Sequence, residues 1–319
     1  MSGDSIGYFD FFPLAASATH GAVPTWGIAC IVESTVDALP VGTRVYGMVP
    51  MGLSFVAYPA GVTTREFRCS APHRAKRDAV YNTYTLLDSD PLYAGAALEN
   101  EMILYRPLFL TAFLLREVVL SDHAELVVMT SASSKTATCL ATLLQGKPNR
   151  PKVVGLTSQR NLAFCQASGA FDALYTYDGF ASALDLSPSY TVIDFACDDA
   201  VLRALQRPSL VRMSVIGSTH QGKFNSVLQG HGFDPALVRP TFFFAPKAAV
   251  AIIKRLGQAE FQKQVFTEFH RVLGALKVKV KAARTEAELL ECYRGYVCGS
   301  IPADESWVGV FNGVGAALL

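Results

Sequence analysis

The stretch VVMTSASSKTATCLATLLQG, residues 127–146, decides the predicted fold. It begins with an apolar run typical of a buried strand and continues through a loop of serines, threonines and one lysine. It then shows apolar residues at helical spacing, and Gly146 and Pro148 are the residue types that commonly end a helix. The stretch therefore predicts a strand, a loop and a helix, although the loop contains no glycine.

Apolar β-type segments and helical segments alternate on both sides of this loop. Strands are predicted at 125–130, 152–157, 172–177, 190–196 and 211–217. Such alternation is typical of an α/β domain with a doubly wound parallel sheet, the Rossmann fold, in which the crossovers are right-handed. We predict this domain over residues 116–277, and the helical stretch 246–276 is predicted to bridge it to a second domain.

The second predicted domain is β-rich and occupies residues 1–115. Short strands are expected at 25–34, 42–50 and 54–61, each punctuated by glycine or proline. A strand within SWVGVFNG, residues 306–313, is expected to return the C-terminal part, 278–319, to this domain. The apolar window 102–120 contains arginines, a proline and a glutamate, so it predicts a buried helix and not a membrane span.

Composition excludes several classes of function. The chain has 319 residues, of which 50% are hydrophobic and 17% charged, and its net charge of +1 gives no field that would gather nucleic acid or an anionic membrane. The basic cluster HRAKR, 73–77, is interpreted as a solvated face. Seven scattered cysteines without a C-x-x-C pair, and histidines without ligand spacing, predict neither disulfides nor a metal. No secretion signal is recognisable, so the expected location is cytoplasmic.

Several segments together resemble the medium-chain dehydrogenase/reductase superfamily, and within it the DUF2855 family. The residues that carry the resemblance are 23–34, 41–47, 105–115, 127–146 and 153–178. The resemblance extends over nearly the whole chain. It implies a GroES-like β-rich domain, a Rossmann nucleotide-binding domain, and an oxidoreductase that acts on a small molecule and forms a homodimer in many relatives.

Two departures from the superfamily pattern refine this expectation. Zinc-dependent members carry a P-G-H-E-x-x-G segment where this chain has Pro24, Thr25, Trp26 and Gly27, and tryptophan is not a zinc ligand. The resemblance therefore indicates the zinc-independent members, such as quinone and enoyl reductases. Relatives also carry more β-structure before the segment matching GYFDFFP, 7–13, so we expect either a short gene model or a β-rich domain shortened at its N-terminus.

The serine-rich loop is the first part of a predicted cofactor site. A Rossmann loop uses glycine for close approach to a pyrophosphate, but hydroxyls donate to phosphate oxygens and a lysine adds positive charge. The alternative is that the hydroxyls only cap the following helix. A Walker A loop is excluded because its glycines are absent, and no partner groups of an amidase nucleophile are recognisable. The predicted phosphate-binding residues are Ser131, Ser133, Ser134, Lys135 and Thr136.

The end of the second strand predicts which nicotinamide cofactor is bound. An Asp or Glu at this position accepts hydrogen bonds from the ribose of NAD, whereas this chain has GLTSQRN, without an acid. The sequence thus favours NADP(H), unless Arg160 and Asn161 are ordinary solvent-facing residues. By resemblance Tyr177 lies beside the adenine, and Gly217 and Ser218 lie at the carboxyl edge of the sheet. This second set consists of Thr157, Ser158, Arg160, Asn161, Tyr177, Gly217 and Ser218.

Two hypotheses of function follow. The first is a zinc-independent, NADPH-dependent reductase of an activated C=C bond or a quinone or carbonyl compound, because Trp26 and the phenylalanines of 7–13 offer aromatic surface for such substrates. A phenol is able to protonate the developing negative charge, so Tyr8, Tyr46 and Tyr81 are the candidate catalytic residues. The alternative is a pseudo-oxidoreductase with a non-redox role, as a cyclase, a lyase or a binding protein, which the glycine-free loop favours.

Overall fold

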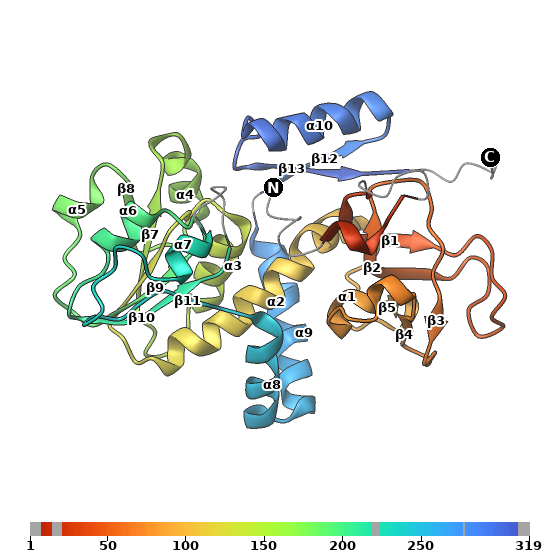
Figure 1. Ribbon diagram of the computed structural model, residues 1–319, viewed down its shortest axis with the longest axis horizontal. Helices are drawn as coiled ribbons and strands as arrows, with labels where there is room; N and C mark the ends of the chain where they lie inside the picture. Colours follow the sequence, from red (N-terminus) through yellow and green to blue (C-terminus); the bar gives the residue numbers. More distant parts are fainter. Residues whose placement is uncertain (1–7, 15–20, 218–223, 277, 312–319) are drawn as a thin grey trace. The chain divides into compact units, whose positions relative to one another are not determined.

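The computed structural model describes residues 8–14, 21–217, 224–276 and 278–311 (Figure 1). The chain divides into two compact units, which are described separately below. Unit 1 comprises Met1–Leu104, Val280–Ile301 and Glu305–Leu319. Unit 2 comprises Tyr105–Lys279 and Pro302–Asp304.

Unit 2 contains a six-stranded sheet in which every neighbouring pair of strands is parallel. The strand order is β11-β10-β9-β6-β7-β8. The chain thus proceeds from β6 outward to β8, then crosses to β9 on the other side of β6, which places a topological switch point between β6 and β9. The predicted Rossmann fold is confirmed. Its strands are β6 (Leu126–Met129), β7 (Lys152–Thr157), β8 (Ala173–Thr176), β9 (Tyr190–Asp194), β10 (Leu210–Val215) and β11 (Thr241–Phe242).

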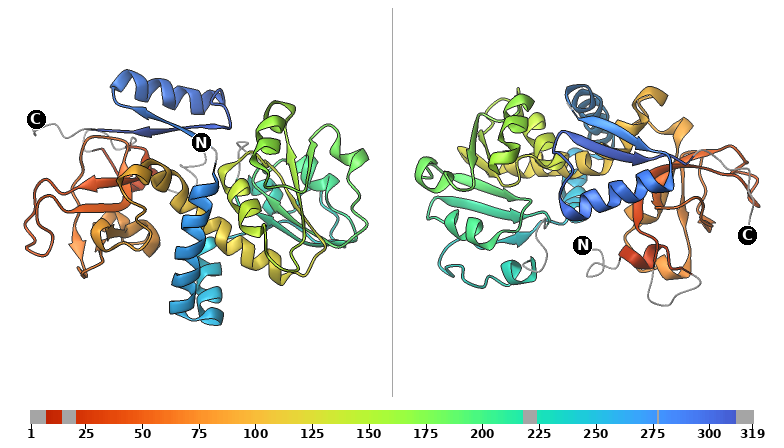
Figure 2. Two further views of the ribbon diagram at one scale, coloured as in Figure 1. Left: turned by 180° about the vertical axis from the view of Figure 1, so that it is seen from behind. Right: turned by 90° about the horizontal axis from the view of Figure 1, so that it is seen from above.

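Helices lie on both faces of this sheet (Figure 2). The stretch 246–276 is not one helix, because the chain breaks at Gly257, whose φ of 83° lies outside the helical region. No helix in the described ranges is long and apolar enough to cross a membrane. The helices are α2 (Glu99–Ser121), α3 (Lys135–Leu144), α4 (Leu162–Ser168), α5 (Phe180–Ala183), α6 (Asp199–Ala204), α7 (Phe224–Leu228), α8 (Ala245–Leu256) and α9 (Gln258–Ala275).

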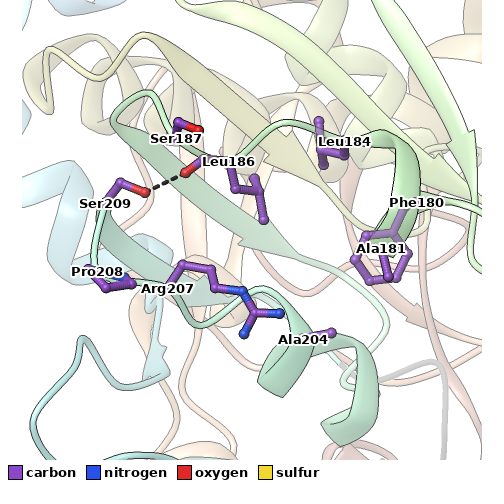
Figure 3. A pocket seen from close by; sticks show the side chains of 9 residues that line it. All are labelled: Phe180, Ala181, Leu184, Leu186, Ser187, Ala204, Arg207, Pro208 and Ser209. Carbon is purple, nitrogen blue, oxygen red and sulfur yellow. Dashed lines mark hydrogen bonds between the residues drawn. The ribbon is translucent and has the colours of Figure 1, made fainter.

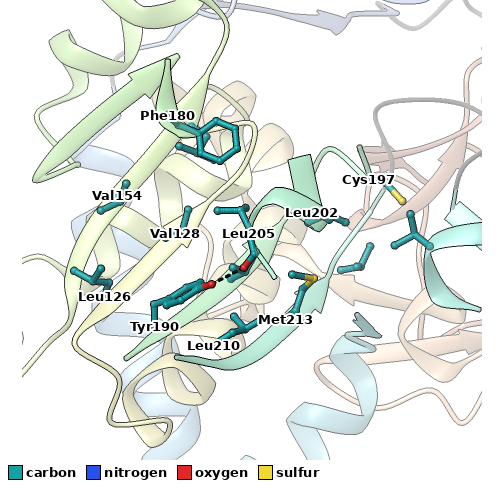
Figure 4. Close-up of a cluster of buried hydrophobic side chains, with 14 of the residues drawn as sticks. Leu126, Val128, Val154, Phe180, Tyr190, Cys197, Leu202, Leu205, Leu210 and Met213 are labelled. Carbon is teal, nitrogen blue, oxygen red and sulfur yellow. Dashed lines mark hydrogen bonds between the residues drawn. The ribbon is translucent and has the colours of Figure 1, made fainter. Parts of the chain in front are cut away.

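Alternate residues of the strands form the core on one face of the sheet (Figure 4). Because side chains alternate along a strand, Leu126 and Val128 share this face, where Val192 of β9 joins them. Leu202 and Leu205, at α6, pack onto the same cluster. The core therefore fixes the central strands whose carboxyl ends carry the candidate cofactor site.

Unit 1 contains a five-stranded antiparallel sheet with the order β1-β2-β5-β4-β3. The predicted strands 25–34 and 42–50 correspond to β1 and β2, but 54–61 is extended in the sheet only at its end, and β4 and β5 were not predicted. The strands are β1 (Pro24–Cys30), β2 (Arg44–Pro50), β3 (Pro59–Ala60), β4 (Glu66–Cys69) and β5 (Thr83–Leu86). Short helices η1 (Tyr8–Phe11), η2 (Pro72–Arg74), α1 (Ala79–Asn82), η3 (Leu87–Ser89) and η4 (Ala96–Leu98) accompany them.

The C-terminal strand belongs to a separate two-stranded sheet. β13 (Glu305–Gly309) pairs with β12 (Lys279–Ala283), and α10 (Glu286–Cys298) connects the two. The strand predicted within 306–313 therefore exists, but it does not join the five-stranded sheet. Its partner β12 was not predicted, although the alternation of valine and lysine over 278–281 is typical of a half-buried strand.

Tyr84 is the centre of the core of unit 1. Its ring is fully buried and stacks on Phe67, with ring centroids 5.1 Å apart. Its hydroxyl donates to the Met48 carbonyl at 2.6 Å and accepts from Arg74 at 2.9 Å. Arg74 is only 2% exposed, so the interpretation of the basic cluster 73–77 as a solvated face was wrong for this residue.

Replacing Gly47 with alanine is expected to destabilise unit 1 by about 1–3 kcal/mol. A Cβ atom at Gly47 would lie 2.5 Å from Cδ1 of Tyr84, and the ring has no room to retreat because its hydroxyl is held from two sides. Denaturant unfolding measures the effect. Gly52→Ala is the matched control, because nothing lies within 4 Å of the added atom; equal stability of both variants would contradict the expectation.

Candidate functional site

The carboxyl ends of β6 and β9 are joined across the switch point by a buried polar pair. The hydroxyl of Thr130 donates to Asp194, and it accepts the N–H of Phe195 at 2.9 Å. Asp194 also accepts the N–H of Cys197 at 2.9 Å. Burial raises the pKa of Asp194, and these hydrogen bonds oppose that shift. The Thr130 hydroxyl therefore already donates its hydrogen within the protein, so it has no donor for a ligand.

Ser131 takes the backbone conformation that glycine normally supplies in such a loop. Its φ is 44°, in the left-handed region that few non-glycine residues adopt. The Ser131 N–H donates to the hydroxyl of Tyr177 at 2.7 Å. Burial raises the pKa of Tyr177, so this hydroxyl is neutral at physiological pH. Tyr177 thus reaches from the end of β8 to the loop after β6.

The close approach that loop glycines allow in other Rossmann folds is provided here by a glycine on the neighbouring strand. Ala132 is fully buried, and its N–H donates to the Leu156 carbonyl of β7 at 2.9 Å. A Cβ atom at Gly155 would lie 2.8 Å from Cβ of Ala132. The loop is able to dispense with a glycine at position 132 because β7 has one beneath it.

The first turn of α3 presents hydroxyl groups and one cation. Ser134 is the N-cap, since its Oγ accepts the N–H of Ala137 at 3.3 Å, so the capping alternative holds for this residue. Ser133 Oγ accepts from Nδ2 of Asn161 at 3.0 Å, which connects the loop to the segment after β7. Thr136 is half-buried beside them. The first N–H groups of a helix have no carbonyl partner within it, so this end attracts anions.

Lys135 is a half-buried cation at the same helix terminus. Burial lowers its pKa, and no group opposes that shift. Within the described ranges Lys135 makes no ion pair. An ammonium group that is partly removed from water and lacks a counter-ion is costly unless an anion joins it.

The segment after β7 carries no carboxylate. Ser158 is half-buried and Arg160 is exposed, and η5 (Gln159–Asn161) starts directly after the strand. Thr157 is only 1% exposed, and its carbonyl accepts the N–H of Tyr177 at 3.0 Å. Gly217 follows β10 at the same edge of the sheet, whereas Ser218 lies outside the described residues.

Two of the predicted catalytic tyrosines lie beside Trp26 in unit 1. The ring of Tyr46 stacks on Trp26 with centroids 5.7 Å apart and planes at 14°, and Tyr81 lies at 6.1 Å. Tyr46 is 4% exposed, whereas Trp26 and Tyr81 are half-buried. The side chain of Tyr8 lies outside the described part of the chain.

Sequence reasoning missed Thr130 and Asp194. The signal was present, because an aspartate that ends an otherwise apolar buried strand requires hydrogen-bond partners. Among the described residues, no three His, Cys, Asp or Glu side chains gather as metal ligands.

Comparison with known proteins supports the fold and identifies the family. No curated protein matches the chain. A quinone oxidoreductase from Coxiella burnetii is 15% identical, with a TM-score of 0.52 over 88% of this chain and 77% of that one. A protein from Mesorhizobium loti, described as an NADPH:quinone reductase, is 14% identical, with a TM-score of 0.51 over 89% and 76%. The chain thus shares the fold of these two proteins. The family model for "Protein of unknown function (DUF2855)" matches residues 1–299, so the chain belongs to the DUF2855 family.

Proposed function

We propose that the chain is a zinc-independent, NADPH-dependent reductase of an activated C=C bond or of a quinone or carbonyl compound. The observation that carries the proposal is Lys135, a half-buried cation at the N-terminus of α3. In α/β sheets of this type, ligands bind outside the carboxyl ends of the strands at the switch point. Lys135 lies next to that point, so the missing counter-ion is best supplied by a bound phosphate.

The donor set of the loop fits the pyrophosphate of a dinucleotide. Lys135 offers charge, and Ser133 and Thr136 offer hydroxyls at the same helix terminus, whose N–H groups add a favourable dipole. When it is bound, NADPH supplies the hydride for reduction. The protein's task is then to hold and orient the dinucleotide and to exclude water from the reacting atoms.

The segment after β7 supports NADPH over NADH. An NAD-specific site places a carboxylate there to accept from the ribose hydroxyls, and such a carboxylate would repel a 2′-phosphate. This chain has Ser158 and the exposed Arg160 instead. A guanidinium recognises phosphate through charge-assisted, bidentate hydrogen bonds.

Titration with NADPH is expected to raise the melting temperature, because a ligand that binds only the folded state stabilises it by RT ln(1 + [L]/Kd).

Arg160→Ala is expected to weaken the binding of NADPH about tenfold or more and to leave the binding of NADH nearly unchanged, since only NADPH carries the 2′-phosphate. Arg207→Ala is the control, because Arg207 is an exposed arginine at the opposite edge of the sheet. Absence of binding at millimolar NADPH and NADH would exclude the reductase, and equal losses for both cofactors would exclude the role of Arg160.

Trp26 and its neighbours support an electron-poor, planar substrate. Trp26 and Tyr81 are half-buried aromatic rings, backed by the enclosed rings of Tyr46 and of Phe11, whose ring lies 5.8 Å from that of Tyr81. Aromatic faces bind planar rings by offset stacking. Tyr81 is the better candidate proton donor of the two described tyrosines, because it is half-buried while Tyr46 is almost fully enclosed.

A quinone is expected to quench the fluorescence of Trp26 in a saturable manner. The chain has two tryptophans, so Trp307→Phe leaves Trp26 as the only indole and Trp26→Phe leaves Trp307 as the matched control. Tetramethyl-1,4-benzoquinone is the suitable probe, because all four of its ring positions carry methyl groups and leave no unsubstituted carbon to which the chain's free thiols would add. Saturable quenching in Trp307→Phe and only collisional quenching in Trp26→Phe is the expected result; identical quenching curves would contradict this substrate surface.

The second candidate is a pseudo-oxidoreductase that keeps the fold for a non-redox role. One observation favours it: the loop's groups already have partners within the protein, as Ser131 donates to Tyr177 and Ser133 accepts from Asn161. A dinucleotide would compete with these contacts. The NADPH titration separates the two candidates, because the pseudo-oxidoreductase predicts no stabilisation by either nicotinamide cofactor.

A further inference from the structure

A pocket of about 480 Å³ lies in unit 2, at the amino edge of the sheet (Figure 3). Its residues belong to α5, to the end of α6 and to the loops that lead into β9 and β10. Ser187 and Arg207 precede β9 and β10 at the amino edge, whereas the cofactor loop follows β6 at the carboxyl edge, so these two pocket residues lie at the opposite end of the strands from that loop. The pocket is lined by Phe180, Ala181, Leu184, Leu186, Ser187, Ala204, Arg207, Pro208 and Ser209.

One side of the pocket is apolar and continues into the core. Phe180 belongs to the buried cluster of unit 2, and Leu184 and Leu186 pack against it. The two serines add little donor capacity. The Ser209 hydroxyl donates to the Leu186 carbonyl at 2.5 Å, and the Ser187 hydroxyl donates to Asp185 at 2.6 Å.

Arg207 is the one charged residue in the lining. In Figure 3 its side chain extends away from Pro208 and towards Ala204. The guanidinium donates one long hydrogen bond, at 3.4 Å, to the Gln206 carbonyl, and its charge opposes the rise that burial causes in the pKa of Tyr190. Asp185, which lies in sequence between the lining residues Leu184 and Leu186, does not line the pocket and already accepts the N–H and the hydroxyl of Ser187. The guanidinium therefore keeps most of its donors for a ligand.

We propose that this pocket binds a small carboxylate that carries an apolar tail. The guanidinium of Arg207 holds the carboxylate through two parallel hydrogen bonds, and the tail lies against Phe180, Leu184 and Leu186. A carboxylate fits better than a phosphate, because a single guanidinium with no free hydroxyl donor satisfies two oxygens and leaves a third without a partner. The site is independent of the cofactor, since none of its residues belongs to the loop after β6.

Hexanoate is the probe that tests this site, with 1-hexanol as the neutral analogue of equal length and acetate as the anion without a tail. Protein-observed NMR is expected to show saturable chemical-shift changes at the lining residues when hexanoate is added. Both analogues are expected to bind at least about tenfold more weakly than hexanoate. Arg207→Gln is expected to abolish the preference for hexanoate over 1-hexanol. Lys254→Gln, which removes an exposed positive charge elsewhere in unit 2, is expected to preserve it.

Two further measurements make the proposal refutable. Ala181→Trp fills the pocket from an exposed position and is expected to remove hexanoate binding while the protein stays folded. Saturating NADPH is expected not to displace hexanoate, whether or not the proposed cofactor binds. Equal affinity for hexanoate and 1-hexanol, full binding by Arg207→Gln, or displacement by NADPH would each overturn the assignment.

Discussion

Replacing Lys135 with methionine is expected to weaken NADPH and NADH by the same factor, about 10- to 100-fold. The proposed contact of Lys135 is with the pyrophosphate, which both cofactors share, whereas the proposed contact of Arg160 is with the 2′-phosphate. The two substitutions therefore have different signatures. Fluorescence or calorimetric titration with both cofactors distinguishes them.

The same substitution is expected not to lower the stability of the free protein. Burial lowers the pKa of Lys135 in the folded state, so the unfolded chain binds its proton more tightly. The resulting cost to folding is complete below the folded pKa and disappears only above the unfolded pKa. Methionine retains the apolar stem and removes this cost. A loss of cofactor binding together with an unchanged or higher melting temperature is evidence for an anion site, because a residue that only supports the fold would show the reverse.

Lys152→Met is the control, since Lys152 is an exposed lysine at the start of β7, at the other edge of the same sheet. It is expected to leave the affinity for both cofactors unchanged. The assignment of Lys135 fails if Lys135→Met binds NADPH as tightly as the parent protein does.

The parallel sheet was predictable because its strands are continuous apolar runs. β7 was predicted at its observed bounds, and β6 and β9 differ from their predicted ranges only at the ends. β11 was not predicted as a strand, because it consists of two exposed residues in the run TFFF. In so short a run, the spacing of apolar residues does not distinguish a strand from a loop. The β-rich unit was harder to predict, since β4 contains only two buried residues, Phe67 and Cys69.

The residues of the candidate site were predictable by type, but their contacts were not. The loop hydroxyls were evident from the sequence, yet the contact between Ala132 and Gly155 joins a residue of the loop after β6 to a residue of β7, and the two meet only in the folded sheet. The hydrogen bond from Ser131 to Tyr177 likewise depends on the strand order. Arg74 shows most clearly what the sequence did not predict. A basic cluster normally indicates solvent exposure, but the fold packs the guanidinium of Arg74 against the rings of Phe11 and Phe12.

A buried ionic network fastens α2 to α9, and it carries the largest expected effect on stability. Arg116 of α2, whose side chain is 3% exposed, bonds Glu117 at 2.7 Å and Glu268 of α9 at 3.2 Å. Its guanidinium also lies 4.2 Å from the centroid of the Phe113 ring. Each glutamate has further cationic partners. Arg255 bonds Glu117, while Lys147 and Arg271 bond Glu268.

Arg116→Met is expected to destabilise the protein by about 3–5 kcal/mol, because Glu117, whose side chain is 13% exposed, then keeps only the exposed Arg255 among its cationic partners in the described residues. Denaturant unfolding followed by far-UV circular dichroism measures the change. Arg294→Met, which replaces an exposed arginine of α10, is the matched control and is expected to have little effect.

The dependence of this effect on pH separates lost charge pairing from lost packing. Burial alone raises the pKa of Glu117 and Glu268, but hydrogen bonds from their cationic partners outweigh it and hold both pKa values below the ordinary 4.5. A carboxylate with a lowered folded pKa contributes stability that is complete above its unfolded pKa and is lost as the pH falls through the folded value. Arg116 is the first of the groups that lower the pKa of Glu117, so the difference between Arg116→Met and the parent is expected to be full at pH 7 and to shrink below about pH 4.5. A difference that stays constant over this range would assign the effect to the packing of Arg116 on Phe113.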